Sequence, residues 1–219
     1  WLFNLHYFDW ATRWLDNAID NGFWEISFDN ISYLIDNWII SNKPGKKDGW
    51  HSYTTSLRIR NWIWLFNFCP ELVNKNRIKS LWYQICWLKS HPESCHGGNH
   101  WIENLTALAI GGSQFKGIFS KNILNFSLEQ LKKELNFQIL KDGGHQERSV
   151  SYHLLVLNRL VELGCVLELT YGSAPDWLCE YIEKMINWTE SIKLLNGNFP
   201  SFNDSANDGF NDFYKILDF

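Results

Sequence analysis

Apolar side chains recur three or four residues apart along most of this chain, and that spacing constrains its fold more than any other feature. Ile31, Leu34, Ile35, Trp38 and Ile39 are one example. Such spacing places side chains on one face of an α-helix. The sequence contains no long run with the two-residue alternation of a half-buried β-strand. We therefore predict an all-α fold of roughly seven helices, each about ten to twenty residues long, joined by short loops.

Glycines and capping residues predict where several of these helices begin and end. Gly111-Gly112 and Gly164 are each expected to end a helix. Ser127 and Gln130 have the spacing of a capping box and are expected to open one. Successive antiparallel helix pairs of this size predict an incomplete (α/α) toroid or a helical bundle, formed by a single domain over residues 1–219.

Charge and cysteine usage argue against several classes of partner. The formal net charge is -4 and the basic residues are scattered, whereas a nucleic-acid-binding protein usually has a basic face. No uncharged run is long enough to cross a bilayer, so we predict no transmembrane segment. The 5 cysteines are odd in number and have no CxxC spacing, so neither a disulfide framework nor a thiolate metal site is expected.

Tryptophan is unusually frequent, with 13 residues in the chain. Aromatic side chains bury a large area each, so most of these indoles are expected to lie in the core. A minority are expected to line a groove, where a flat ring can pack against the apolar face of a sugar.

Two short segments combine amide, imidazole, carboxylate and guanidinium groups where a helix is expected to begin. One is Gly98-Asn99-His100-Trp101-Ile102-Glu103-Asn104, and the other runs from Asp142 to His153. A core does not need such groups, because a buried polar atom costs free energy unless it is paired. A cleft that binds and deprotonates a polar substrate does need them.

A third polar segment precedes the helix that Pro70 is expected to end. In it, Tyr53 and Arg58 are candidates to face a saccharide, with the Arg58 guanidinium forming a fork to a carboxylate. An ordinary helix start with an exposed arginine is an equally good interpretation.

Five motifs in this order resemble the heparinase II/III-like polysaccharide lyases, and they extend over essentially the whole chain. They are Trp1-Leu2-Phe3-Asn4-Leu5-His6-Tyr7-Phe8-Asp9-Trp10; Ser56-Leu57-Arg58-Ile59-Arg60-Asn61-Trp62; Gly98-Asn99-His100 with Glu103-Asn104; Asp142-Gly143-Gly144-His145 with Glu147-Arg148-Ser149 and Tyr152-His153; and Phe202-Asn203-Asp204-Ser205-Ala206.

The resemblance implies an α/α toroid followed by a β-sandwich domain that completes the cleft and is absent from this sequence. The chain starts at Trp1 and its only methionine is Met185, so we expect a fragment of a longer protein. The resemblance also implies β-elimination of an acidic, uronic-acid-containing polysaccharide without a cofactor. It favours a periplasmic or extracellular bacterial location.

By resemblance, Asn99 neutralises the uronate carboxylate, and Tyr152 takes the proton, protonates the leaving oxygen, or does both. His100 is the partner base or acid. A free phenol has a pKa of about 10, so Tyr152 needs a nearby cation such as Arg148 to lower it. Each residue also has a structural interpretation: Asn99 as a helix cap, His100 as a structural histidine, and Tyr152 as a core residue.

The remaining candidate residues are predicted to contact substrate or to support the site. Glu147 and Arg148 are also candidates for an ion pair that holds their loop. His96 and His100 have the spacing of a zinc pair, but the glycines between them argue against a helix, so no metal is expected. The full substrate-binding set is Tyr53, Arg58, Glu103, His145, Glu147, Arg148, His153 and Asn203.

Two other functions compete with a lyase. One is a non-catalytic protein that binds glycans or helps assemble a surface polysaccharide. The other is a glycoside hydrolase, which needs two carboxyl groups, and Glu147 and Asp204 are the plausible pair.

Overall fold

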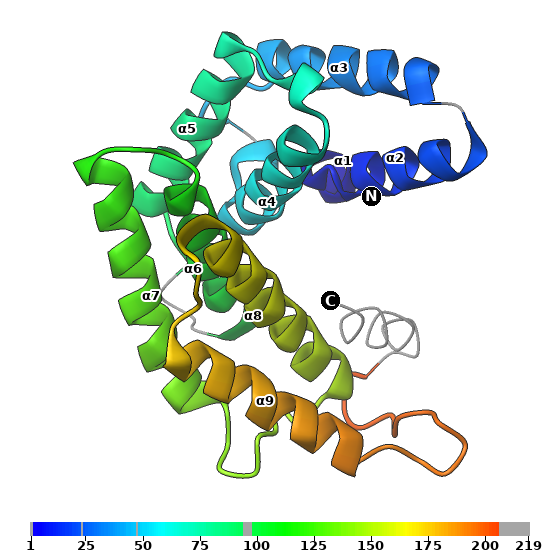
Figure 1. The fold of residues 1–219 in the computed structure, drawn as a ribbon, viewed down its shortest axis with the longest axis vertical. Helices are drawn as coiled ribbons and strands as arrows, with labels where there is room; N and C mark the ends of the chain where they lie inside the picture. Colours follow the sequence, from blue (N-terminus) through cyan, green and yellow to red (C-terminus); the bar gives the residue numbers. More distant parts are fainter. Residues whose placement is uncertain (1, 23, 47, 94–97, 206–219) are drawn as a thin grey trace. The chain divides into compact units, whose positions relative to one another are not determined.

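In the computed structural model, residues 2–22, 24–46, 48–93 and 98–205 are described, and every regular element among them is a helix (Figure 1). One isolated antiparallel bridge joins Ile139 to His145, without forming a strand. The all-α prediction is therefore confirmed. The helices cluster into two compact units, Trp1–Glu93 and Ser94–Phe219, each described below by itself. The organisation of residues 1–219 as one domain stays a prediction.

The first unit contains five α-helices and two short 3-10 helices among its described residues. Where two helices were expected before residue 41, the structure has three, because Phe8 adopts a left-handed conformation (φ 64°) and breaks the first from the second. Helix α1 packs on α4, α2 packs on α3 and α4, and α4 packs on α5. The elements are α1 (Leu2–Tyr7), α2 (Asp9–Asn21), α3 (Trp24–Ser41), η1 (Asp48–Trp50), α4 (Ser52–Phe68), η2 (Pro70–Leu72) and α5 (Lys75–Ser90).

Aromatic rings form the core of this unit, as the tryptophan content predicts. The Trp38 ring lies 5.9 Å from Trp50 and 5.6 Å from Trp62, centroid to centroid. Phe8 meets Trp62 edge to face at 5.4 Å. All four side chains are buried, so the turn at Phe8 is held by a ring that the core encloses.

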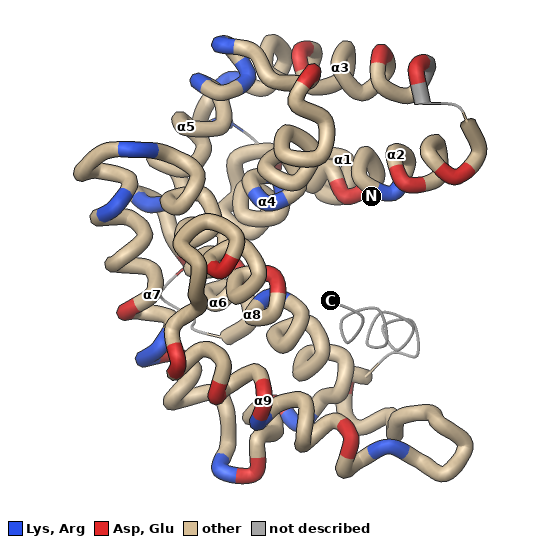
Figure 2. The backbone as a smooth tube through the Cα atoms, in the orientation of Figure 1, with Lys and Arg blue, Asp and Glu red and all other residues tan. Residues whose placement is uncertain are grey.

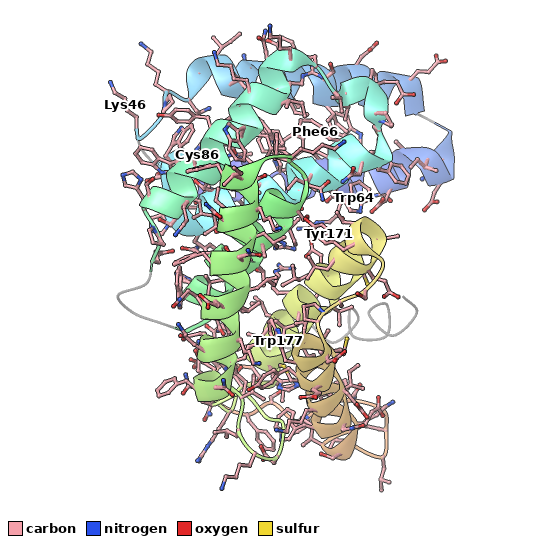
Figure 3. The ribbon with its side chains drawn as sticks, turned by 60° about the vertical axis from the view of Figure 1, so that its left-hand side comes forward. Lys46, Trp64, Phe66, Cys86, Tyr171 and Trp177 are labelled. Atoms are coloured by element: carbon pink, nitrogen blue, oxygen red, sulfur yellow. The ribbon has the colours of Figure 1, made fainter. Side chains whose placement is uncertain are left out.

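The second unit contains α6 (Gly98–Ser113), α7 (Ile118–Gln138), α8 (Val150–Tyr171) and α9 (Asp176–Ser191). Helix α6 packs on both α7 and α8, and α9 packs on α8 and α7. Every residue of α6 from Trp101 to Ser113 is buried, as expected of a helix that is covered on all sides. Trp177 of α9 lies toward α7 (Figure 3), where the Lys132 ammonium is 5.9 Å from its ring centroid.

Two glycines were expected to end helices, and the structure places one of them in the last turn of its helix and the other well inside its helix. Gly112 is within α6, and a Cβ added there would lie 2.9 Å from the backbone nitrogen of Leu124 on α7. Gly164 is within α8, which continues to a left-handed C-cap at Gly172. The helix end predicted at Gly164 was therefore wrong, whereas α6 does end at Ser113, one residue after the predicted Gly111-Gly112. At Gly112 the missing side chain also lets two helices approach closely.

The predicted capping box at Ser127 was also wrong. Ser127 is buried in the middle of α7, where its hydroxyl donates to the Ile123 carbonyl oxygen at 2.8 Å. A serine inside a helix often makes this bond to the residue four positions earlier. Helix α7 instead begins at Ile118, after Gly117 at φ 118°.

Helix α8 is long and apolar enough to cross a membrane by length and composition alone. Half of its most apolar window is buried within the fold, and a core helix of a soluble protein meets the same criterion. Figure 2 shows acidic and basic residues interspersed along α7 and α9. Among the residues described, no three His, Cys, Asp or Glu side chains are grouped to hold a metal ion. Cys69, Cys86, Cys165 and Cys179 are free thiols, while Cys95 and His96 lie outside the described residues.

Candidate functional site

The segment between α7 and α8 folds back tightly before it reaches the predicted site. Leu140 donates its backbone N–H to the Gly144 carbonyl at 2.8 Å, and Gly143 donates to the Leu140 carbonyl at 3.0 Å. Gly143 has φ 97°, and a Cβ there would lie 2.3 Å from the Lys184 carbonyl oxygen of α9. Only glycine fits this position, because the turn needs a left-handed residue and lies directly against another helix.

His145 and His153 lie on the inner side of this segment. The Nε2 atom of His145 is 2.8 Å from the Gln138 amide oxygen, and Nε2 of His153 is 2.9 Å from the Thr189 hydroxyl oxygen. The two histidines are 1% and 0% exposed, and burial lowers the pKa of each to about 4. They do not line an open surface, which agrees with a role in supporting the site, and both are neutral residues of the core near neutral pH.

Glu147 and Asn99 bring the two polar segments together. The Asn99 amide nitrogen Nδ2 lies 3.5 Å from Oε2 of Glu147, at the long end of hydrogen-bond distances. Asn99 lies in the first turn of α6, which begins at Gly98, so it is not the N-cap residue that the alternative interpretation expected. Its buried amide oxygen Oδ1 has no hydrogen-bond partner among the described residues. The amide is thus only weakly held and has capacity for a further partner.

Two neighbours act on the pKa of the Glu147 carboxyl group. Partial burial raises the pKa of Glu147, the negative charge of Asp204 raises it further, and His100 opposes both. His100 is exposed in the first turn of α6, next to Asn99. These four side chains therefore form one polar cluster within the second unit: Asn99, His100, Glu147 and Asp204.

Tyr152 lies in the first turn of α8, half-buried, five residues after Glu147. The helix is capped by Ser149, whose hydroxyl oxygen accepts the Tyr152 backbone N–H at 3.4 Å. Before it, Arg148 is exposed and has a left-handed backbone (φ 54°). Such a conformation costs about 1–2 kcal/mol for a non-glycine residue, so its neighbours must hold it in place.

The holding contacts come from the segment after α9. Asn203 donates from Nδ2 to the backbone carbonyl oxygens of both Glu147 and Arg148, at 3.1 Å each. The Ser205 hydroxyl oxygen accepts the Val150 backbone N–H at 2.8 Å. Asn203, predicted to bind substrate, therefore bonds to the turn between the two motifs. Ala206, the last residue of its motif, lies outside the described residues.

Arg58 and Glu103 differ from their prediction as ligands of substrate. The Arg58 guanidinium is completely buried, 3.9 Å above the Trp38 ring centroid, with Nε donating to Gln84 Oε1 at 2.7 Å. The Glu103 carboxylate is also completely buried and accepts a bond from Arg159 Nε at 2.7 Å. Both charges are taken up by partners within the protein, and neither faces an open surface.

Tyr53 belongs to the first unit, in the first turn of α4, where it is half-buried and meets the Tyr7 ring edge to face at 6.0 Å. Its predicted contact with a saccharide stays a prediction. The sequence analysis missed Ser149 and Ser205 as members of the site. Ser149 could have been found, because a serine three residues before Tyr152 has the spacing of an N-cap.

The described part of the chain is all-helical, with the Asn99 amide in the first turn of α6 and the Tyr152 phenol in the first turn of α8. The sequence matches the family described as Heparinase II/III N-terminus. The model of that family matches residues 30–218, and the chain belongs to the family.

Known relatives agree with that assignment. A heparin-sulfate lyase from Bacteroides thetaiotaomicron is 28% identical over 193 aligned positions, which cover 77% of this chain and 27% of that protein. The crystal structure of heparinase III superposes with a TM-score of 0.78 at 23% identity, over 97% of this chain and 36% of that one. Heparan sulfate lyase HepC from Pedobacter heparinus gives a TM-score of 0.70 at 20% identity, over 93% and 34%. The chain thus spans about a third of the length of these proteins.

Proposed function

We propose that this chain supplies the amide and phenol of a lyase that cleaves a uronic-acid-containing polysaccharide by β-elimination. Membership of the heparinase II/III family and the relative named heparin-sulfate lyase support this class of reaction. Candidate substrates are heparin- or heparan-like, alginate-like and bacterial surface polysaccharides. The β-sandwich domain that would complete the cleft stays a prediction.

The observation that carries the proposal is the state of Asn99. Its Nδ2 is only weakly held by Glu147, at 3.5 Å, and is therefore available to donate to another carboxylate. A β-elimination begins with loss of the proton beside the uronate carboxylate, which leaves extra negative charge next to an existing one. An N–H donor aimed at the carboxylate oxygens favours that transition state, and an amide supplies it without titrating. In this proposal, substrate takes the place of Glu147 at Nδ2.

Tyr152 and His100 carry the proton transfers in this proposal. A base removes the proton from the carbon next to the carboxylate, and the electron pair of that C–H bond forms the new carbon–carbon double bond. The bond from the neighbouring carbon to the glycosidic oxygen breaks, and an acid protonates that oxygen. Tyr152 serves as one or both of these groups, with His100 as its partner. Arg148, exposed four residues before Tyr152, is the candidate cation that favours the phenolate.

The test uses the protein in its full length with a panel of uronate polymers. A lyase releases an unsaturated product that absorbs ultraviolet light. We expect Tyr152→Phe to lower kcat by about 100- to 10,000-fold, the usual contribution of a general acid or base. Tyr171→Phe is the matched control, because Tyr171 is exposed at the far end of the same helix (Figure 3). Absence of unsaturated product with every polymer, or an unimpaired Tyr152→Phe variant, would refute the proposal.

A glycoside hydrolase is a second candidate, favoured by the electrostatic coupling between Glu147 and Asp204. Asp204 raises the pKa of Glu147, and a carboxyl group with a raised pKa beside an ionised one is the arrangement of a hydrolytic acid and its partner. Reducing ends released without unsaturation, and lost in Glu147→Gln, would select this function. Polymer binding with no turnover by either assay would select the third possibility, a non-catalytic glycan-binding protein.

A further inference from the structure

The segment Phe202–Ser205, here called the strap, crosses the turn 147–150 that leads into α8. The two residues joined by each contact are about fifty-five positions apart in the chain. The strap follows an exposed loop, and Asn203 itself has a left-handed backbone (φ 48°), like Arg148 opposite it. Asparagine adopts this conformation readily, whereas for Arg148 it is unfavourable and must be held by the surroundings.

The hydroxyl groups of Ser205 in the strap and Ser149 in the turn form a chain of hydrogen bonds, and their other contacts determine which hydroxyl is the donor in each bond. The Ser205 hydroxyl donates to the Phe202 carbonyl oxygen and accepts the Val150 N–H. Its remaining lone pair faces the Ser149 hydroxyl at 3.2 Å, so Ser149 is the donor of that bond. The Ser149 oxygen in turn accepts the N–H of Tyr152.

This chain of bonds satisfies the start of α8 from outside the helix. The first N–H groups of any helix lack partners within it. Here Ser149 takes the Tyr152 N–H and Ser205 takes the Val150 N–H. On the other side of the turn, Asn203 uses both N–H bonds of its amide on the carbonyl oxygens of Glu147 and Arg148. The strap thus forms hydrogen bonds both to two carbonyl oxygens and to one backbone N–H of the turn.

We infer that Asn203 and Ser205 are positioning residues, which fix the turn 147–150 and thereby the phenol of Tyr152 relative to the amide of Asn99. This inference rests on the proposed function, and it changes the role of Asn203 from a ligand of substrate to a support for the turn. The link to Asn99 passes through Glu147, whose carbonyl the strap holds and whose carboxylate meets Nδ2 of Asn99. A displacement of about 1 Å in such an arrangement can reduce turnover by about 100-fold.

The experiment compares variants that separate the amide from the backbone conformation. Asn203→Gly keeps a residue that readily adopts φ 48° but removes both donors. Asn203→Asp keeps the shape but turns an acceptor toward the two carbonyl oxygens. Ser205→Ala removes the hydroxyl, and Ser205→Thr restores it. The control is Asn196→Ala in the preceding loop, where the side chain also bonds to a backbone N–H.

Two readouts are made on the full-length protein. On a uronate polymer we expect Asn203→Asp and Ser205→Ala to lower kcat by about 10- to 100-fold with KM changed less than about twofold, and Ser205→Thr to recover most of the loss. In hydrogen–deuterium exchange, the amides of Val150 and Tyr152 should exchange at least about tenfold faster in Ser205→Ala than in Asn196→Ala.

The two readouts separate failure of this inference from failure of the proposed function. Unchanged exchange in every strap variant would overturn the inference, whatever the activity. Faster exchange with wild-type kcat would also overturn it, because the turn would then not position the reacting groups. If the wild-type protein shows no lyase activity, the proposed function fails, and the role of the strap in fixing the turn is decided by exchange alone.

Discussion

The substitutions Gly112→Ala and Gly164→Ala should change the free energy of unfolding in opposite directions. Gly112 lies in the last turn of α6 and Gly164 in the interior of α8, so the gain in helix propensity is no larger at Gly112 than at Gly164. Alanine is more favourable than glycine in a helix interior by about 1 kcal/mol. What differs is the atom that the new methyl group meets.

At Gly112 the added Cβ would lie 2.9 Å from the Leu124 backbone nitrogen and 3.0 Å from the Ser120 carbonyl oxygen. Both belong to the backbone of α7 and cannot rotate aside, so α6 and α7 must move apart. Overpacking typically costs about 1–3 kcal/mol, and we take the upper end because the obstacle is backbone. After the gain of about 1 kcal/mol in helix propensity, Gly112→Ala should lose about 2 kcal/mol.

At Gly164 the added Cβ would lie 3.5 Å from the Ile182 Cδ1 atom, which is an ordinary contact with a flexible side chain. Gly164→Ala should therefore gain up to about 1 kcal/mol. Urea unfolding followed by tryptophan fluorescence gives both values, and hydrogen exchange in α6 and α7 shows where the loss occurs. If both variants shift the midpoint in the same direction, or if Gly112→Ala is as stable as wild type, then close helix contact is not the reason for Gly112.

Two further predictions concern buried charge and pH. Arg159→Met should cost about 3–5 kcal/mol, because it removes the guanidinium that is paired with the Glu103 carboxylate, which is 0% exposed. Lys193→Met, at a partly exposed pair, should change the free energy of unfolding by less than about 1 kcal/mol. Equal effects of the two variants in urea unfolding would contradict this prediction. His145 and His153 have folded-state pKa values of about 4, below their ordinary 6.5, so the unfolded chain binds their protons first as pH falls. Stability should be complete above pH 6.5 and fall by about 3 kcal/mol per histidine toward pH 4, and a urea midpoint that does not change between those values would refute this.

Much of the fold could be predicted because the side chains on the buried face of a helix recur every three or four residues, and this spacing is visible in the sequence. Helix ends were harder, since one residue type serves two purposes. A glycine without a side chain suits a turn as well as a close helix contact, which is its use at Gly112. The Ser127 hydroxyl suits a cap as well as a bond within the helix, and the second is observed.

The site was predictable where residues matched motifs of the family, and unpredictable where a charge is buried against a partner from another helix. The sequence placed Asn99 and Glu147 in one site, and the structure brings them into contact. Arg58 was interpreted as a substrate fork because its acceptor, Gln84, is 26 positions away, and Glu103 because Arg159 is 56 positions away. Nothing near either charge in the sequence indicates that it is buried.

The burial of Arg58 has a consequence for anyone who shortens this protein. Its NH1 group donates to the backbone carbonyl of His6 at 3.2 Å, and the Asn61 amide donates to that of Tyr7 at 2.8 Å. The last residues of α1 are thus acceptors for two side chains of α4, the buried Arg58 and the half-buried Asn61. A truncation that begins after Tyr7 would remove one hydrogen-bond acceptor from the buried Arg58 guanidinium and one from the Asn61 amide. Helix α1 should therefore be kept in any shortened version of the protein.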